Sequence, residues 1–173
     1  MNIRRLTPAD AEDYRALMLA AYKAHASAFT STLAERAPLP LRWWEARLAE
    51  QSDAEMVLGA FAHDALVGVT GLRFQTRERL RHKATLFGMA VRPAFARRGI
   101  GRALVQAALD AAARHDGIHL VQLTVTEGNV AALALYEACG FERFGSEPDA
   151  VAGPAGFLVK RHLWRRVGVT TVL

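Results

Sequence analysis

Apolar residues in the first fifty positions recur at helical spacing. Between residues 8 and 24 they fall three and four positions apart, so one face of a helix over 8–24 is expected to be buried. Thr7 and Pro8 supply the N-cap and the first helical position that commonly open such a helix. A short strand over 2–6 precedes it, and a second helix is expected over 41–50. The N-terminal part of the chain therefore predicts a strand followed by two helices.

From residue 55 onward the pattern changes to that of strands. Runs over 55–62, 65–75 and 84–91 are rich in apolar residues and are separated by the turn His63-Asp64 and by a charged loop over 77–83. Consecutive strands with short connections of this kind predict an antiparallel meander.

The second half of the chain alternates between helical and extended patterns. A helix is expected over 99–114, with Ile100, Leu104, Ala107 and Ala111 on the side that packs on the sheet. A strand over 118–125, a helix over 130–139 and two strands over 141–144 and 157–164 complete the expected elements. This order predicts an α/β or α+β fold with a central, mostly antiparallel sheet flanked by helices.

Composition narrows the class of protein. A chain of 173 residues with 51% hydrophobic content is expected to fold as one domain over 1–173. The apolar runs are too short for a membrane span and the N-terminus lacks a secretory pattern, so we expect a cytoplasmic protein without a membrane partner. The net charge of +5 favours an anionic ligand, but the arginines are scattered, and no nucleic-acid partner is indicated.

Cysteine and histidine give little sign of reactive or metal chemistry. Cys139 is the only cysteine, and its place near the end of a predicted helix indicates a small core residue. His115 and His119 come closest to metal-ligand spacing, but Gly117 between them predicts the end of a helix. We therefore expect no metal site.

The most informative segment is 91–104, where an apolar strand passes through an arginine and glycine turn into a helix. Gly99 and Gly101 let the backbone approach a ligand closely, and the first helical turn offers unpaired N–H groups. Arg97, Arg98 and Arg102 surround this helix end with positive charge. The segment predicts a phosphate-binding site.

Two common phosphate motifs do not fit this segment. Leu104 stands where the dinucleotide fingerprint has its third glycine, and the Gly-Lys-Ser/Thr of the nucleoside-triphosphate loop is absent from the sequence.

A second suggestive segment covers 123–141. Asn129 is placed as a helix N-cap and Gly140 as a helix stop. Asn129 and Tyr136 lie two helical turns apart and share a side of the helix with Leu133. A phenol is thus expected on a rigid helix, facing the end of the preceding strand.

Together these two segments resemble the GNAT superfamily of acyl-CoA-dependent N-acetyltransferases. The Q/R-x-x-G-x-G/A loop of that family is matched by the run Ala96-Arg97-Arg98-Gly99-Ile100-Gly101, in which Ala96 replaces the usual Gln or Arg. The later Asn, the A-x-x-x-Y spacing and the Gly-Phe pair of the family are matched by Asn129, Ala132, Tyr136 and Gly140-Phe141. These motifs cover 84–141.

The resemblance implies acetyl-CoA as co-substrate and no metal. The glycine loop would hold the pyrophosphate, and the pantetheine arm would lie along 87–91, in a gap where the fourth and fifth strands splay apart. A backbone N–H near Met89 would stabilise the developing oxyanion. The residues expected to contact acetyl-CoA are Met89, Ala90, Val91, Arg97, Arg98, Gly99, Ile100, Gly101, Arg102, Ala103, Asn129, Ala132 and Tyr136.

The implied activity is transfer of the acetyl group to a primary amine of a small molecule, peptide or protein, by direct attack in a ternary complex. Tyr136 would act as general acid and protonate the departing thiolate. The general base is not fixed by the sequence, because the strand over 84–91 holds no carboxylate. Glu127 is the first candidate, and His82 and Glu35 are alternatives.

The acceptor amine is expected near the first two helices. Phe29, Glu35 and Trp43 are the candidate acceptor-binding residues, although the packing of a helix on the sheet is the favoured explanation for Trp43 and Trp44. A non-catalytic acyl-CoA-binding sensor or interaction module remains the alternative to an enzyme, and a homodimer is left open.

Overall fold

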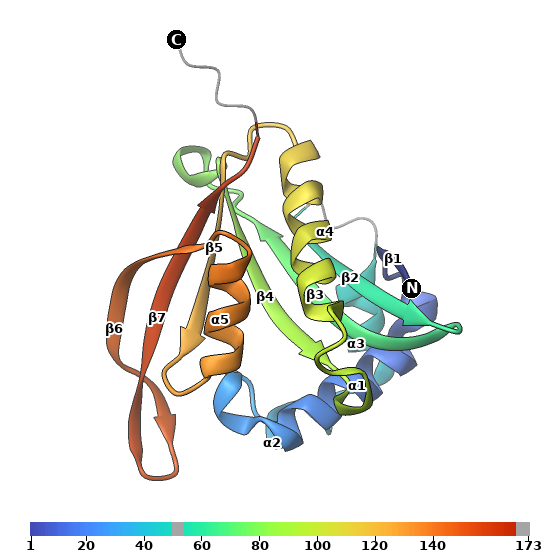
Figure 1. The fold of residues 1–173 in the computed structure, drawn as a ribbon. Helices are drawn as coiled ribbons and strands as arrows, with labels where there is room; N and C mark the ends of the chain where they lie inside the picture. Colours follow the sequence, from blue (N-terminus) through green and yellow to red (C-terminus); the bar gives the residue numbers. More distant parts are fainter. Residues whose placement is uncertain (50–53, 169–173) are drawn as a thin grey trace.

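The computed structural model describes residues 1–49 and 54–168, and within them the chain forms one mixed sheet (Figure 1). Its strands are β1 (Asn2–Arg5), β2 (Glu55–Ala62), β3 (Ala65–Phe74), β4 (Lys83–Val91), β5 (Leu120–Thr126), β6 (Glu142–Gly153) and β7 (Gly156–Arg166). The strand order is β1-β2-β3-β4-β5-β7-β6. Neighbours are antiparallel except β4 and β5, which are parallel. The expected mixed, mostly antiparallel sheet is confirmed.

Helices cover both faces of this sheet. They are α1 (Ala11–Ala24), α2 (Leu33–Arg36), α3 (Leu41–Leu48), α4 (Ile100–Arg114) and α5 (Val130–Ala138), with short 3-10 turns η1 (Pro8–Asp10), η2 (Ala26–Ala28), η3 (Glu78–Leu80) and η4 (Pro93–Phe95). In Figure 1, α4 and α5 lie on one face, α1 and α3 lie on the other, and α2 lies beside the ends of β4 and β5.

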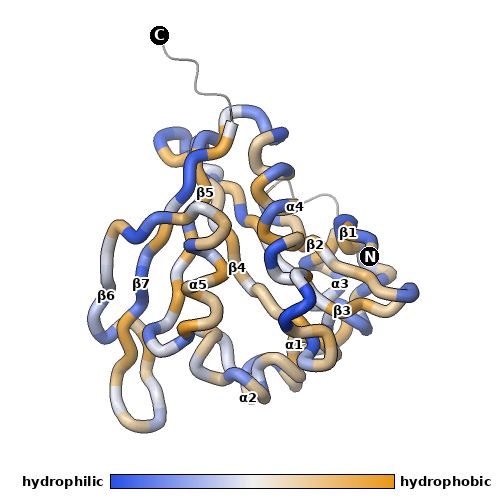
Figure 2. Tube along the Cα trace, viewed as in Figure 1, coloured by the Kyte–Doolittle hydropathy of each residue, from blue (hydrophilic) through white to orange (hydrophobic). Residues whose placement is uncertain are grey.

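Each face has its own hydrophobic core. Leu104 and Leu163 belong to the core under α4 and α5, whereas Tyr14 and Trp44 belong to the core under α1 and α3. Figure 2 shows hydrophobic positions along the central strands, while β6 and β7 alternate between hydrophilic and hydrophobic stretches. The central strands are therefore packed on both faces, and this packing holds β4 and β5 in place.

The buried side of α4 differs from the expected one. Ile100 and Leu104 are buried as predicted, but Ala107 and Ala111 are only half-buried. The side chains that complete the buried stripe are Val105, Ala108, Leu109 and Ala112. The helix is rotated so that the larger Val105 and Leu109 face the sheet, which removes more apolar surface from water.

A bulge in β4 changes which face its residues occupy. Gly71 of β3 pairs with Phe87, and Val69 pairs with Ala90, so Gly88 and Met89 together oppose a single β3 residue. Gly88 has φ +61, a left-handed conformation that glycine adopts at low cost. Before the bulge Leu86 faces the α4 core, and after it Ala90 faces the α1 core. The bulge thus lies where β4 reaches the open end of the sheet.

The parallel strands β4 and β5 separate along their length. They pair at Lys83↔Leu120, Ala84↔Val121 and Thr85↔Gln122, near the start of both strands. Beyond Thr85 the rest of β4 runs without a β5 partner, which confirms the splay between the fourth and fifth strands. The loops into α4 and α5 leave from this open end (Figure 1).

Several boundaries differ from expectation. The segment between the first two predicted helices contains η2 and α2, and the last two strands are much longer than 141–144 and 157–164. The expected strand start at Ile118 moves to Leu120. α3 ends at Leu48, and Glu50, the expected end of that helix, lies outside the described residues. The long β6 is exposed on most of its length, so no burial pattern reveals it.

Candidate functional site

The N-terminus of α4 presents unused hydrogen-bond donors at the open end of the splay. Gly99 is the N-cap, with φ 80, and it provides no side chain to cap the helix. The N–H of Ala103 donates to the Gly99 carbonyl at 3.0 Å. Among the described residues, the N–H groups of Ile100, Gly101 and Arg102 have no such partner. This helix end is suited to bind an anion.

Three arginines place positive charge around the same helix end. Arg97, Arg98 and Arg102 are exposed, and none of them forms an ion pair within residues 1–49 and 54–168. Arg98 lies over the ring of Phe95 at 5.4 Å. By contrast, Arg92 donates to the Leu66 carbonyl at 2.8 Å and has a structural role. The positive charges of Arg97, Arg98 and Arg102 therefore reinforce the partial positive charge of the helix dipole at the α4 N-terminus.

Gly101 serves packing between helices. A Cβ at this position would lie 3.1 Å from Cδ2 of Leu135 on α5. The glycine therefore allows α4 to approach α5 closely, and it does so whether or not a ligand is bound.

Asn129 caps α5 as expected. Its Oδ1 accepts a hydrogen bond from the backbone N–H of Ala132 at 3.2 Å. The side-chain amide N–H groups of Asn129 remain as donors at the loop that leaves β5. Asn129 and Ala132 thus lie at the same open end of the sheet as the α4 N-terminus.

Tyr136 lies inside α5, against the sheet. Its side chain is 6% exposed, and its ring packs edge-on against Phe141 at 5.9 Å. Burial raises the pKa of the phenol above its ordinary value, and the nearby Cys139 raises this pKa further. The phenol of Tyr136 is therefore neutral at physiological pH. Cys139 itself is buried, which confirms its place in the core.

The candidate bases lie in different places. Glu127 forms an ion pair with Arg161 of β7 at 2.5 Å, and both line a pocket of about 150 Å³ beside α5. The Glu35 carboxylate accepts the backbone N–H of Thr32 at 2.8 Å and caps α2. His82 precedes β4, at the end where β4 and β5 still pair, and so lies away from the open end. The structure does not bring these three residues together.

The candidate acceptor residues lie on the α1 face. Phe29 packs edge-on against Tyr22 at 5.0 Å. Trp43 is half-buried, with the guanidinium of Arg36 at 4.6 Å and that of Arg47 at 5.0 Å from its ring centre. Trp44 is 1% exposed, so it packs helix on sheet.

The structure adds a histidine and a glutamate that the sequence did not single out. His162 of β7 has its Nε2 3.1 Å from Oε2 of Glu147 on β6. In the β5–β7 register, His162 is directly opposite Thr124, which is exposed. This pair depends on the register of the β6–β7 hairpin, which is interrupted by two irregularities, and no local sequence motif predicts it.

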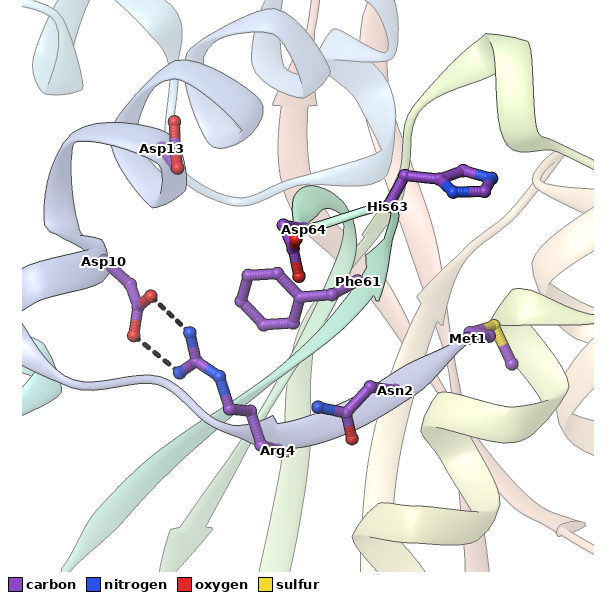
Figure 3. Close-up of a pocket in the computed structure, with 8 residues that line it drawn as sticks. All are labelled: Met1, Asn2, Arg4, Asp10, Asp13, Phe61, His63 and Asp64. Atoms are coloured by element: carbon purple, nitrogen blue, oxygen red, sulfur yellow. Dashed lines mark hydrogen bonds and ion pairs between the residues drawn. The ribbon is translucent and has the colours of Figure 1, made fainter.

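Another pocket lies at the β1 edge of the sheet (Figure 3). It measures about 400 Å³, and its walls include Phe61 and the ion pair of Arg4 with Asp10 at 2.7 Å. The hydrogen bonds from Arg4, together with one from the Thr7 backbone, lower the pKa of Asp10 to about 2. Because β1 and β5 are separated by three strands, this pocket is distinct from the splay.

Two further observations concern the described residues as a whole. No three His, Cys, Asp or Glu side chains gather there in a group that could hold a metal ion. None of the helices described combines the length and apolar character needed to cross a membrane.

A splayed pair of parallel strands, with a donor-rich helix end at its open side, defines the GNAT acetyltransferase fold. Residues 18–141 match the acetyltransferase (GNAT) family, and the chain belongs to this family.

Known proteins support this assignment. A GNAT-family acetyltransferase from Streptococcus pneumoniae is 27% identical, with a TM-score of 0.84 over 96% of this chain and 99% of that one. A Salmonella typhimurium protein, solved with its cofactor acetyl-CoA, shares the fold at 21% identity, with a TM-score of 0.80 over 100% of this chain and 97% of the other.

Curated sequences match over shorter stretches. The ribosomal protein bS18-alanine N-acetyltransferase of Escherichia coli K12 is 44% identical over 59 residues, which are 34% of this chain and 39% of that enzyme. The chain spans between 33% and 39% of the length of the curated relatives that it matches.

Proposed function

We propose that this protein transfers the acetyl group of acetyl-CoA to a primary amine of a small molecule, peptide or protein, in a ternary complex. The observation that carries the proposal is the α4 N-terminus at the open end of the splay. Within the described part of the chain, three of its N–H groups have no hydrogen-bond partner and the three arginines around it form no ion pair. Family membership and the E. coli relative, which acts on a ribosomal protein, support it.

Acetyl-CoA matches the chemistry of this end of the sheet. Its pyrophosphate is a suitable counterpart for the N–H groups from Ile100 to Arg102 and for the guanidiniums of Arg97 and Arg98. Its pantetheine amides can pair with the free edge of β4 after Thr85, as an added strand would. This placement brings the thioester toward the bulge at Gly88 and Met89, where a backbone N–H can stabilise an oxyanion.

Tyr136 is the proposed proton donor to the departing thiolate. Burial raises the pKa of the phenol, so the proton is in place at physiological pH. The raised pKa also makes transfer to a thiolate uphill, so the proton must move together with cleavage of the C–S bond. Glu127 stays a candidate base, with its carboxylate already engaged by Arg161.

A thiol-release assay with acetyl-CoA tests the proposal. The acceptors would be small primary amines, peptides that begin with alanine, and peptides with an internal lysine. We expect amine-dependent thiol release and a mass gain of one acetyl group on the acceptor. Tight CoA binding without release for every amine would instead identify a non-catalytic acyl-CoA-binding module, and failure to bind acetyl-CoA would overturn the site itself.

A further inference from the structure

Beyond the splay, the α1 face of the sheet is only partly covered, by η2, which contacts β5. α1 and α3 pack on the β2, β3 and β4 part of this face. On the far side of the gap, Thr124 is exposed although β5 is an internal strand. Its neighbours in sequence, Leu123 and Val125, are buried in the α4 and α5 core. The side of β5 that carries Thr124 is therefore an exposed surface next to the gap between β4 and β5.

His162 lies on the same exposed surface of the sheet as Thr124. Residues paired across antiparallel strands point to the same face, and His162 is paired with Thr124. Lys160 lies on the same face, and its Nζ donates to Oγ1 of Thr30 at 2.7 Å, in the segment that follows η2. His162 therefore lies one strand beyond β5 from the splay, two residues along β7 from the Lys160 contact with the segment that contains Phe29.

The partner of His162 fixes the state of its ring. A carboxylate can only accept hydrogen bonds, so the contact of Nε2 with Glu147 at 3.1 Å places the ring proton on Nε2. The lone pair of the neutral imidazole is then on Nδ1. The ring of Phe144, 53% exposed, packs edge-on against the imidazole at 5.8 Å and limits its rotation.

We propose that His162, oriented by Glu147, accepts the proton of the acceptor amine. The inference rests on the proposed acetyl transfer and supplies the base that β4 lacks. β7 lies one strand spacing, about 4.8 Å, beyond β5. The proton would therefore pass from an amine at the gap to the imidazole through water over the exposed side of β5.

The proposed step balances as follows in atoms and charge. The acceptor ammonium gives one proton, through the water, to Nδ1 of His162, and the imidazolium later releases it to solvent. The neutral amine attacks the thioester carbonyl carbon, so that a C–N bond forms and the C–S bond breaks. The CoA thiolate takes the hydroxyl proton of Tyr136, and the phenolate recovers a proton from the nitrogen of the new amide through solvent.

Other charged groups near the imidazole are few. Glu147 comes from β6, and Lys160 lies two residues away on the same face of β7. Glu142 of β6 is paired with Trp164, further along this face. Arg161 bonds Ser146 and Glu127 on the opposite face. From β5, the facing residue is the uncharged Thr124.

Rate profiles against pH test the role of His162. We expect His162→Gln to lower kcat/KM for an alkyl amine about 100-fold near pH 7 and to remove the acidic limb of the profile, which reports protonation of the base. Acetyl-CoA affinity should stay unchanged. The control His63→Asn, at the β2–β3 turn on the other side of the sheet, should keep the wild-type profile.

A second readout does not depend on turnover. In ¹⁵N NMR spectra of the wild type, we expect the His162 ring to carry its proton on Nε2, and Glu147→Gln to weaken this preference and lower kcat/KM about 10-fold. A proton on Nδ1, or a His162→Gln profile that keeps its acidic limb, would overturn the inference and leave the acetyl transfer standing. Absence of turnover by the wild type with every amine would overturn both.

Discussion

Gly71 of β3 lies directly beneath the ring of Phe87 on β4. A Cβ at position 71 would come within 2.4 Å of the ring Cζ, closer than side chains tolerate. The ring is held on its other sides by the guanidiniums of Arg73, at 4.8 Å, and Arg47, at 5.7 Å. This contact fixes β4 immediately before the bulge that begins the open part of the splay.

Gly71→Ala is therefore expected to destabilise the fold by about 1–3 kcal/mol, because the rigid, half-buried ring must shift away from its contacts with Arg47 and Arg73. Urea unfolding followed by circular dichroism measures the effect. Gly145→Ala is the matched control, since a Cβ at that strand position meets no atom within 4 Å. Equal stability of the two variants would show that Phe87 is free to move.

The anion site predicts a charge-dependent loss of affinity. The triple variant Arg97→Ala, Arg98→Ala, Arg102→Ala should bind acetyl-CoA at least about 10-fold more weakly by calorimetry, since each charge-assisted phosphate contact contributes roughly 1.5–3 kcal/mol. Arg114→Ala, at the other end of α4, is the control and should bind as the wild type does. Added salt should weaken the wild type more than the triple variant.

Gly101 is a poor choice for that test. A larger residue there contacts Leu135 and disturbs the packing of α5, so lost binding would not separate ligand contact from helix packing.

Tyr136→Phe should lower kcat about 100-fold while it leaves acetyl-CoA affinity unchanged. Because burial raises the pKa of this phenol above its ordinary value of 10, Tyr136 stays protonated through the working range. The pH profile of the wild type should consequently show no basic limb from this residue below about pH 10. A kcat for the variant equal to that of the wild type would remove Tyr136 from the proton-donor role.

The Arg4–Asp10 pair predicts how stability responds to acid. The unfolded chain protonates Asp10 near its ordinary pKa of 3.8, whereas the folded chain does so only at about 2. The stability contributed by this pair is thus present above pH 3.8 and is lost as the pH falls toward 2. Asp10→Asn should flatten the dependence of the urea midpoint on pH over this range.

Asp13→Asn serves as the control for that measurement, since it removes a carboxyl group from the same pocket and keeps the pair (Figure 3). If Asp10→Asn and the wild type lose stability equally between pH 4 and 2, the ion pair does not act as described.

The elements that the sequence predicted well are those whose signal is local. The α4 helix begins at Ile100, one residue after the expected start, because Gly99 and the apolar spacing after it act within a few residues. The Asn129 cap and the Gly140 stop likewise depend on neighbouring residues. Local turn and cap chemistry is therefore sufficient to place the glycine loop and α5.

The features that were not predicted from the sequence depend on the register between paired strands and on its irregularities. In the sequence, Phe87-Gly88-Met89 continues the apolar strand pattern without a break. The bulge that moves Ala90 to the other face of the sheet is visible only in the pairing of β4 with β3. β6 contains Pro148 and Asp149 and has little buried surface, so its length comes from pairing with β7. The contact of His162 with Glu147 has the same origin.

The central claim is that acetyl-CoA bound at the α4 N-terminus is the donor for acetylation of an amine. The most direct test is mass spectrometry of a panel of acceptor amines. Each amine is incubated with acetyl-CoA and either the wild-type protein or the triple arginine variant. We predict an acceptor that gains one acetyl group with the wild type and much less with the variant at limiting acetyl-CoA. Acetylation that proceeds equally with both proteins, or no acetylation of any amine, would contradict the account.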